Sequence, residues 1–234
     1  MSPYVAEFLG TLLLILLGGG VNAAVSLKKS KSENGGWLMI TIGWGLAVML
    51  AIYAVGNISG AHLNPAVTIA LAINGSFSND LILGYIIAQF AGAIVGATLV
   101  WLQYFPHWKE TADQSAKLGV FCTAPAIRNV FTNLMSEIIA TMVLIVALLF
   151  IGANEFIKGL NPIVVGLLII SIGLSLGGTT GFAINPARDL GPRIVHFILP
   201  IHGKGKSDWV YAWIPVLGPI IGGVLGVWVY QLLF

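Results

Sequence analysis

The sequence predicts an all-α membrane protein with six transmembrane helices and two re-entrant half-helices in an inverted repeat. Three observations predict this fold: an apolar composition, six long apolar segments, and two copies of one short motif. Of the 234 residues, 57% are hydrophobic and only 9% are charged, whereas a soluble domain averages about 25% charged residues. The composition therefore disfavours a soluble helical protein with a large core.

Six segments are long enough to cross a bilayer, which takes about 20 mostly apolar residues. Turn residues and most charges fall between these segments, and aromatic residues gather near their ends, as they do at membrane interfaces. The long apolar runs also lack the period-2 alternation of membrane β-strands. The predicted spans are approximately residues 3–25, 37–56, 81–105, 130–153, 162–179 and 209–234.

Two further apolar pieces, 65–74 and 186–200, are too short to cross a bilayer and are predicted to be re-entrant half-helices. Each follows an asparagine suited to be the N-cap and begins with a proline, whose missing N–H costs nothing at the first helical position. One Asn-Pro-Ala motif would be interpreted as a simple turn, but two at matching positions would not. The motifs are Asn64, Pro65 and Ala66, and Asn185, Pro186 and Ala187.

The chain repeats itself, and the repeat matches Glu7 with Glu137. We expect one channel domain, 1–234, built from half-repeats at about 1–115 and 125–234. Each half holds three spans, an odd number, so the second half must enter the membrane upside down. The two half-helices would then enter from opposite faces and meet at their asparagines. The matching segments are "AEFLGT" (6–11) with "SEIIAT" (136–141), residues 44–67 with 165–188, and "QFAGAIVG" (89–96) with "PVLGPIIG" (215–222).

Irregular backbone at membrane depth is tolerated only when it is buried or lines a water-filled cavity. The Gly-rich loops 57–64 and 178–185 are therefore predicted to line a pore. Their carbonyl groups would accept hydrogen bonds from a solute, the two asparagine amides would donate, and two facing helix N-termini would repel cations and protons. The candidate carbonyl groups belong to Gly60, Ala61, His62, Gly181, Phe182 and Ala183.

On these residues the chain resembles the aquaporin superfamily over its whole length: six spans, two Asn-Pro-Ala loops, and a glutamate in the first helix of each half. Within it, "NPARD" at 185–189 is similar to the glycerol-facilitator, or aquaglyceroporin, branch, and further residues match that branch: Arg193, Pro215 and Val216. The resemblance implies a selectivity filter, an apolar pore wall and structural supports. These would be Trp44, Gly173, Phe182 and Arg188 for the filter; Val48, Leu144 and Ile169 for the wall; and Glu7, Glu137 and Asp189 for support.

The chemistry of the implied filter suits a small polyol. Trp44 and Phe182 would face its carbon chain, and Arg188, charged at any relevant pH, would donate to its hydroxyl groups. Gly173 would leave room for a three-carbon solute, where a histidine would narrow the filter to water. Taken alone, Trp44 would be interpreted as an interfacial anchor and Phe182 as an aromatic residue of the core; together with Arg188 they favour a filter. His62 is interpreted as a brace of its loop.

The implied function is a passive channel for glycerol and water that excludes protons and ions. Urea, dihydroxyacetone, hydrogen peroxide and protonated lactic acid are further implied solutes. A water-selective channel is the alternative, and an ion-coupled secondary transporter is a more distant one, since Glu7 and Glu137 are the titratable groups that the spans offer it. We expect no enzyme, no cofactor and no metal, an inert Cys122, and no nucleic acid, since the net charge of +2 is small and scattered.

The resemblance also implies a homotetramer in a bacterial plasma membrane, with both termini in the cytoplasm. Ten of the eleven Lys and Arg residues would then lie on the outer side. The positive-inside rule alone predicts the opposite orientation, and it still does when Arg188 and Arg193 are assigned to the pore loop. We follow the orientation that the resemblance implies.

Overall fold

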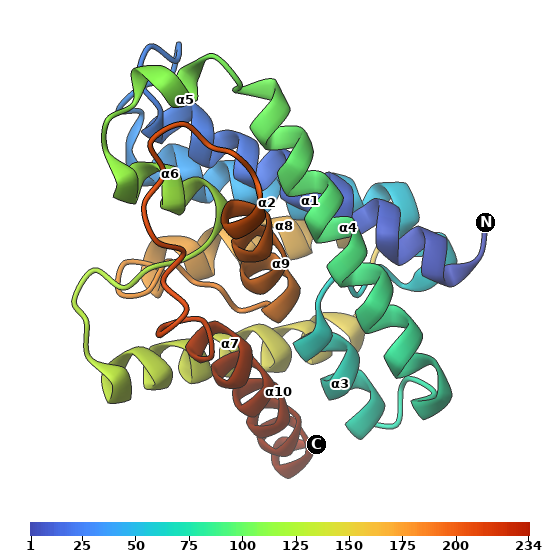
Figure 1. Cartoon of the computed structure of the whole chain (residues 1–234). Coiled ribbons are helices and arrows are strands. Elements are labelled where there is room, and N and C mark those ends of the chain that lie inside the picture. The colour runs from blue at the N-terminus through green and yellow to red at the C-terminus, as the bar shows by residue number, and fades with distance from the viewer.

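The computed structural model describes residues 1–234 as helices joined by turns and loops, with no strand (Figure 1). Six helices are long: α1 (Pro3–Ser26), α2 (Gly36–Ser59), α4 (Ile82–Gln103), α7 (Val130–Gly152), α8 (Asn161–Ser175) and α10 (Ile214–Leu233). The others are short: α3 (Pro65–Ile73), η1 (Asn79–Leu81), α5 (His107–Glu110), α6 (Gln114–Phe121) and α9 (Pro186–Ile198). The predicted all-helical membrane fold is confirmed.

Five of the predicted spans are helices long and apolar enough to cross a membrane: α1, α2, α4 with η1, α7 and α10. The sixth, α8, has 15 residues, or about 22 Å at 1.5 Å per residue. The prediction of 162–179 was too long, because residues 176–180 form turns that contain Gly177 and Gly178. The last helix likewise begins at Ile214, after a turn over 209–213.

The two half-helices, α3 and α9, begin at the prolines of the two motifs, as predicted. The Asn64 side-chain oxygen accepts a hydrogen bond from Ala66 N at 2.9 Å, and that of Asn185 accepts one from Ala187 N at 3.0 Å. Both asparagines have extended backbone, the usual geometry of an N-cap. Local sequence chemistry therefore fixes where each half-helix starts.

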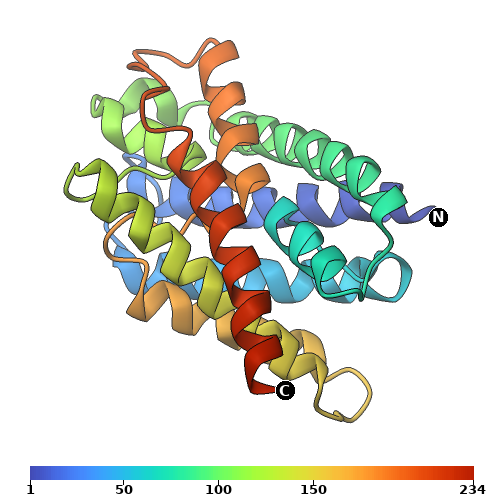
Figure 2. The ribbon, with the colours of Figure 1, turned by 90° about the horizontal axis from the view of Figure 1, so that it is seen from below.

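Equivalent helix pairs pack closely in the two halves: α1 with α4, and α7 with α10. Figure 2 shows α10 crossing α7. A Cβ added to Gly92 would lie 2.3 Å from the Phe8 carbonyl oxygen, and one added to Gly222 would lie 2.3 Å from that of Ile138. Phe8 and Ile138 each follow the glutamate of their half, so Gly92 corresponds to Gly222. The predicted alignment, which matched Gly92 with Gly218, is wrong by one helical turn.

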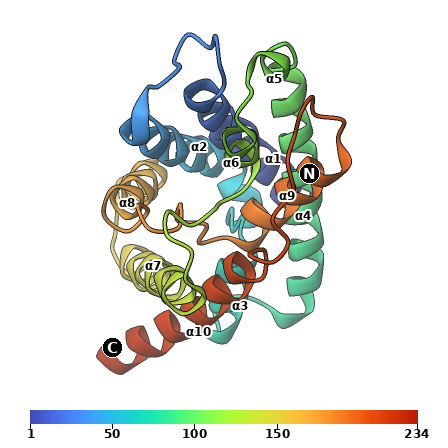
Figure 3. The same cartoon turned by 60° about the vertical axis from the view of Figure 1, so that its left-hand side comes forward.

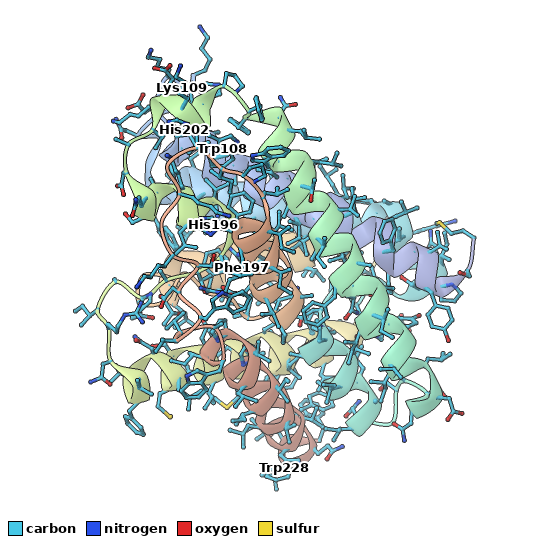
Figure 4. The ribbon with its side chains drawn as sticks, viewed as in Figure 1. Trp108, Lys109, His196, Phe197, His202 and Trp228 are labelled. Carbon is cyan, nitrogen blue, oxygen red and sulfur yellow. The ribbon has the colours of Figure 1, made fainter.

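One end of the bundle is covered by the connections 104–129 and 199–213, which come forward in Figure 3. The first connection folds into α5 and α6, which were not predicted. Trp108 of α5 is buried and stacks on Phe121 of α6 with ring centroids 5.6 Å apart. Figure 4 labels Trp108 at this end, together with His202 of the second connection. This packed cap lies over the bundle, where α6 contacts α1 and α9.

Candidate pore and selectivity filter

The two loops that lead into the half-helices share an unusual backbone. Left-handed φ angles occur at Gly60 (80°), Ala61 (50°) and Leu63 (53°), and at the matching Gly181 (87°), Phe182 (39°) and Ile184 (43°). Such a conformation costs a non-glycine residue on the order of 1–3 kcal/mol, so each loop needs support from outside. Extended backbone points successive carbonyl groups to opposite sides. The left-handed residues interrupt this alternation, and residues 60–64 and 182–185 line one cavity.

Glu7 supports the first of these loops from α1. Its carboxylate accepts hydrogen bonds from the backbone N–H groups of His62 at 2.9 Å and Leu63 at 2.7 Å. It also accepts bonds from the Ser59 hydroxyl at 2.7 Å and the Gln89 amide at 2.8 Å. The side chain is fully buried. Four donors compensate its removal from water, because hydrogen bonds to a charged acceptor are the strong ones.

Glu137 supports the second loop from α7 in the same way. Its carboxylate accepts hydrogen bonds from Ala183 N at 3.1 Å, Ile184 N at 2.9 Å and the Thr180 hydroxyl at 2.6 Å. This side chain is also fully buried. Each carboxylate thus binds the N–H groups of the strained loop in its own half, the geometry expected of a structural group.

The two motif asparagines bind each other's loops. Asn64 Nδ2 donates to the Ile184 carbonyl at 2.8 Å, and Asn185 Nδ2 donates to the Leu63 carbonyl at 2.8 Å. A primary amide has two N–H donors, so one donor on each asparagine is left. Both side chains line the cavity. The meeting point of the half-helices is therefore cross-linked and still offers two donors to a solute.

His62 is held beside this meeting point by its ring. Its Nδ1 lies 3.2 Å from the Thr68 hydroxyl, and its ring packs against Phe77 and Tyr85 with centroid separations of 4.6 and 5.0 Å. These contacts fix the residue in the loop while its neighbours line the cavity. The geometry fits the loop brace that the sequence predicts.

The cavity has a volume of about 240 Å³ and runs between the two halves. Of its 25 lining residues 18 are hydrophobic, so the polar groups form a minority that can fix a solute's position. It reaches from the connection between α7 and α8 to a group of three filter candidates. The lining includes Gly152 and Asn161 at the first end; Val48, Leu144 and Ile169 along the wall; and Trp44, Phe182 and Arg188 at the second end.

Two of the predicted site glycines, Gly173 and Gly181, are absent from the cavity lining. A Cβ on Gly173 would lie 2.5 Å from Cγ2 of Thr41 and 3.0 Å from Cζ of Phe182. The space beside Gly173 is therefore filled by the Phe182 ring and is not open passage. A Cβ on Gly181 would lie 3.3 Å from Cγ2 of Thr123, so that glycine faces the connection 122–129.

Arg188 and Trp44 are in direct contact where the cavity ends. The Arg188 guanidinium carbon lies 4.1 Å from the Trp44 ring centroid, within the range of a cation–π interaction. Both side chains are buried, and Nη1 of Arg188 has no hydrogen-bond partner in the protein. A buried donor without a partner is costly. The candidate filter therefore combines apolar ring surfaces with a buried guanidinium that the protein leaves partly unpaired.

Asp189 acts next to the filter without binding Arg188. Its Oδ1 accepts a hydrogen bond from Arg193 Nε at 2.9 Å, and its Oδ2 accepts one from Thr123 N at 2.7 Å. Arg193 Nη1 in turn donates to the Ser207 carbonyl at 2.9 Å. Both connections of the capped end are thereby fastened to α9. The sequence suggests a loop-holding role for Asp189, but nothing in the pattern points to Thr123.

Comparisons with known proteins agree with this geometry. A sequence profile described as "Major intrinsic protein" matches residues 1–230. A probable glycerol uptake facilitator protein of Thermotoga maritima is 63% identical over 234 residues, which is the full length of both chains. A glycerol uptake facilitator protein of Bacillus subtilis is 59% identical over 97% of this chain and 82% of its own length. The X-ray structure of the aquaglyceroporin from Plasmodium falciparum superposes with a TM-score of 0.84 at 33% identity, covering 97% of this chain and 94% of that one. The chain belongs to the major intrinsic protein family and is an integral membrane protein.

Proposed function

We propose that this protein is a passive channel that lets glycerol and other small uncharged solutes diffuse across a membrane. The observation that carries the proposal is the cavity, whose lining brings together the loop residues 60–63 and 182–184, the two motif asparagines and apolar side chains of the helices. A polyol carries hydroxyl groups along one side of a short carbon chain and is complementary to such a lining. The full-length identity to glycerol uptake facilitators supports the same solute.

At the filter, each group takes a separate part of the solute. The rings of Trp44 and Phe182 face the carbon chain, and the guanidinium of Arg188, which lies in the cavity lining, donates to a hydroxyl group. Gly173 contributes indirectly: because it has no side chain, the Phe182 ring can lie back against α8 and form part of the wall without blocking the passage. The hydroxyl groups then move from Arg188 to the carbonyl row and the two asparagine amides.

Ions and protons are excluded by charge and by the cost of dehydration. The guanidinium of Arg188 is positive and buried beside the passage. The N-termini of α3 and α9 point their positive dipole ends at the middle of the cavity. A cation would lose water in an apolar cavity and meet positive potential at both places. Neutral solutes lose only hydrogen bonds, which the lining replaces.

Purified protein in lipid vesicles tests the proposal. After an osmotic step, vesicles that contain the protein should take up glycerol faster than empty vesicles, and the rate should not change with membrane potential. Urea, dihydroxyacetone and hydrogen peroxide are measured alongside, and lactic acid at several pH values. Fast water flux without glycerol flux would instead identify a water-selective channel. Saturable, potential-dependent flux would identify a coupled transporter.

We propose the same orientation as above, with both termini in the cytoplasm of a bacterial cell, and a homotetramer. In support, two cations of the connection between α1 and α2 are paired: Lys28 with Glu33 at 2.7 Å, and Lys29 with Glu110 at 2.5 Å. Cys122 is the chain's single cysteine and is buried. Because Cys122 is buried, an impermeant maleimide added to whole cells would label only an introduced cysteine that faces outward. In the proposed orientation it labels Lys31→Cys and does not label Lys158→Cys. Labelling of Lys158→Cys alone would show that the protein has the opposite orientation. Native mass spectrometry of the protein released from detergent micelles would give the number of subunits.

A further inference from the structure

Asn22 is a buried polar residue near the end of α1, with 6% of its surface exposed. Both ends of its side-chain amide have partners. Its Oδ1 accepts a hydrogen bond from Nε1 of Trp44 at 3.0 Å, and its Nδ2 donates to the Gly119 carbonyl at 3.1 Å. Asn22 thus joins the filter tryptophan of α2 to α6 in the capped end.

The Trp44 ring has no other polar anchor. On one side it lies against α1, where a Cβ on Gly18 would be 2.4–2.6 Å from three of its ring carbons. Across the ring lies the guanidinium of Arg188, with its carbon 4.1 Å from the ring centroid. These contacts with its two faces limit tilting of the Trp44 ring. They resist rotation of the ring within its own plane only weakly. The edge is held by one hydrogen bond, that from Nε1 to Asn22.

This hydrogen bond also decides which part of Trp44 meets the solute. With Nε1 turned toward Asn22, the indole N–H is satisfied inside the protein. Without an acceptor there, a buried N–H is costly, and the ring gains by rotating until Nε1 reaches the polar groups of the passage. The shape of the apolar wall and the number of donors at the filter would then both change.

We propose that Asn22 is a positioning residue that sets solute selectivity by fixing the orientation of Trp44. The inference rests on the proposed channel function and adds a residue that contributes nothing to the cavity lining. Because the same amide binds Gly119, the position of α6 and the orientation of the filter tryptophan are mechanically joined. The loss of Asn22 should loosen the filter, so that longer polyols pass more easily relative to glycerol.

Two substitutions separate this role from ordinary helix packing. Asn22→Leu keeps the branched shape and the number of side-chain heavy atoms, and it removes both hydrogen bonds. Asn22→Asp keeps an oxygen for Nε1 of Trp44 and loses the amide donor to Gly119. If Asn22 only fastened α6, the two variants would behave alike. A positioning role predicts that Asn22→Asp retains selectivity and that Asn22→Leu loses it.

Asn133 of α7 offers a matched control. It is also buried, with 4% of its surface exposed. Its Nδ2 donates to the Ile127 carbonyl at 3.0 Å, and its Oδ1 accepts from Asn129 N at 2.9 Å. Asn133→Leu therefore removes two hydrogen bonds from a buried asparagine that does not bind the filter. It controls for the general damage of such a substitution.

The experiment measures glycerol, erythritol and xylitol permeability in vesicles with quantified protein. In Asn22→Leu we expect the glycerol-to-xylitol ratio to fall about threefold to tenfold, the factor that corresponds to one hydrogen bond. The ratio should stay within about twofold of the wild type in Asn22→Asp and Asn133→Leu, a margin smaller than one hydrogen bond. An unchanged ratio in Asn22→Leu, or an equal fall in Asn133→Leu, would overturn the inference. Wild-type vesicles that do not conduct glycerol would instead refute the proposed function.

A second measurement keeps the test decisive if Asn22→Leu does not assemble. Trp44→Phe removes the N–H that Asn22 accepts, and Asn22→Ser shortens the acceptor. In the wild-type background Asn22→Ser should lower the glycerol-to-xylitol ratio. In the Trp44→Phe background it should change the ratio no further. Equal effects in both backgrounds would show that Asn22 acts by some route other than Trp44.

Discussion

Gly222→Ala is the sharpest test of the close packing of α10 against α7. The added Cβ would lie 2.3 Å from the Ile138 carbonyl oxygen, about 1.1 Å inside the 3.4 Å at which ordinary contact begins. Both groups belong to helix backbone, so no rotamer change relieves the overlap and α10 must move away from α7. Overpacking of this kind costs about 1–3 kcal/mol, and two rigid partners favour the upper end of that range.

Gly20→Ala in α1 is the matched control, because a Cβ there has no neighbour within 4 Å. The intrinsic helix preference for alanine over glycine is the same in both variants, so their difference isolates the overpacking. For a chain of this size, about 3 kcal/mol corresponds to about 6–12 °C. The thermal midpoint of Gly222→Ala should fall below that of Gly20→Ala by this amount when both are measured in one detergent.

Function should follow stability in this variant. A Cβ on the adjacent Gly223 would lie 3.2 Å from the Ala66 carbonyl oxygen, so α10 rests directly on the start of α3. Moving α10 shifts the half-helix that Asn64 caps, and glycerol permeability per protein should fall in Gly222→Ala but not in Gly20→Ala. Equal midpoints for the two alanine variants would refute the reasoning.

Three further substitutions or conditions test the loops, the filter and the cap. Glu137→Gln replaces a two-oxygen acceptor by one oxygen and a donor that faces backbone N–H groups. We expect a loss of about 3 kcal/mol, from one charged hydrogen bond and one unmatched donor, measured as a lower thermal midpoint. Gly173→His should push the Phe182 ring into the passage, and stopped-flow light scattering should show glycerol flux reduced more than water flux. Asp113 is the N-cap of α6, and hydrogen bonds from Ser115 lower its pKa below the usual value. The stabilisation of α6 by this cap is present above about pH 4 and is lost as the pH falls further, which hydrogen exchange of α6 amides would detect.

Each of these expectations has a contrary outcome. A thermal midpoint of Glu137→Gln equal to the wild type would mean that the strained loop holds its shape without the carboxylate. A parallel loss of water and glycerol flux in Gly173→His would point to general distortion around α8. For the cap, Asp113→Asn should remove the pH dependence of α6 protection, and an unchanged dependence would assign it to another group.

The spans and half-helices could be predicted because they rest on local chemistry. Apolar length locates a membrane helix, and the paired Asn-Pro motifs locate the starts of the two half-helices. Helix ends were harder: α8 stops at Ser175, and residues 176–179, which the prediction included in the span, form turns with Gly177 and Gly178. The cap helices α5 and α6 are short and polar, and they depend on the packing of Trp108 against Phe121, which composition does not reveal.

The repeat register failed for a specific reason. The last helix carries glycines at 218, 222 and 226, so a pattern of two glycines four residues apart fits in two registers. The sequence cannot choose between them, because both give the same small-residue face. The carbonyl contacts of Gly92 and Gly222 decide it.

The site residues divide in a similar way. Charged or capping groups, such as Glu7 and Arg188, stand out from an apolar sequence and were found. A glycine in a sequence indicates that a side chain is absent, but not which neighbour occupies the space. The sequence therefore could not predict that the Phe182 ring fills the space beside Gly173. Asn22 was missed although a signal existed: an amide inside an apolar span needs partners, and Trp44 has the N–H to provide one.

The reciprocal bonds between the half-helices bear on how solutes cross. A coupled transporter must open its site to the two faces in turn, which on an inverted repeat means moving one half against the other. Here Asn64 Nδ2 binds the Ile184 carbonyl and Asn185 Nδ2 binds the Leu63 carbonyl, both across the interface between the halves. Rocking would break both bonds inside an apolar cavity, where unpaired amides and carbonyls are most costly. The same two amides keep a second N–H for the solute, so a hydroxyl group can pass from donor to donor without any movement of the frame. The geometry that cross-links the halves is therefore also the geometry that makes alternating access unnecessary.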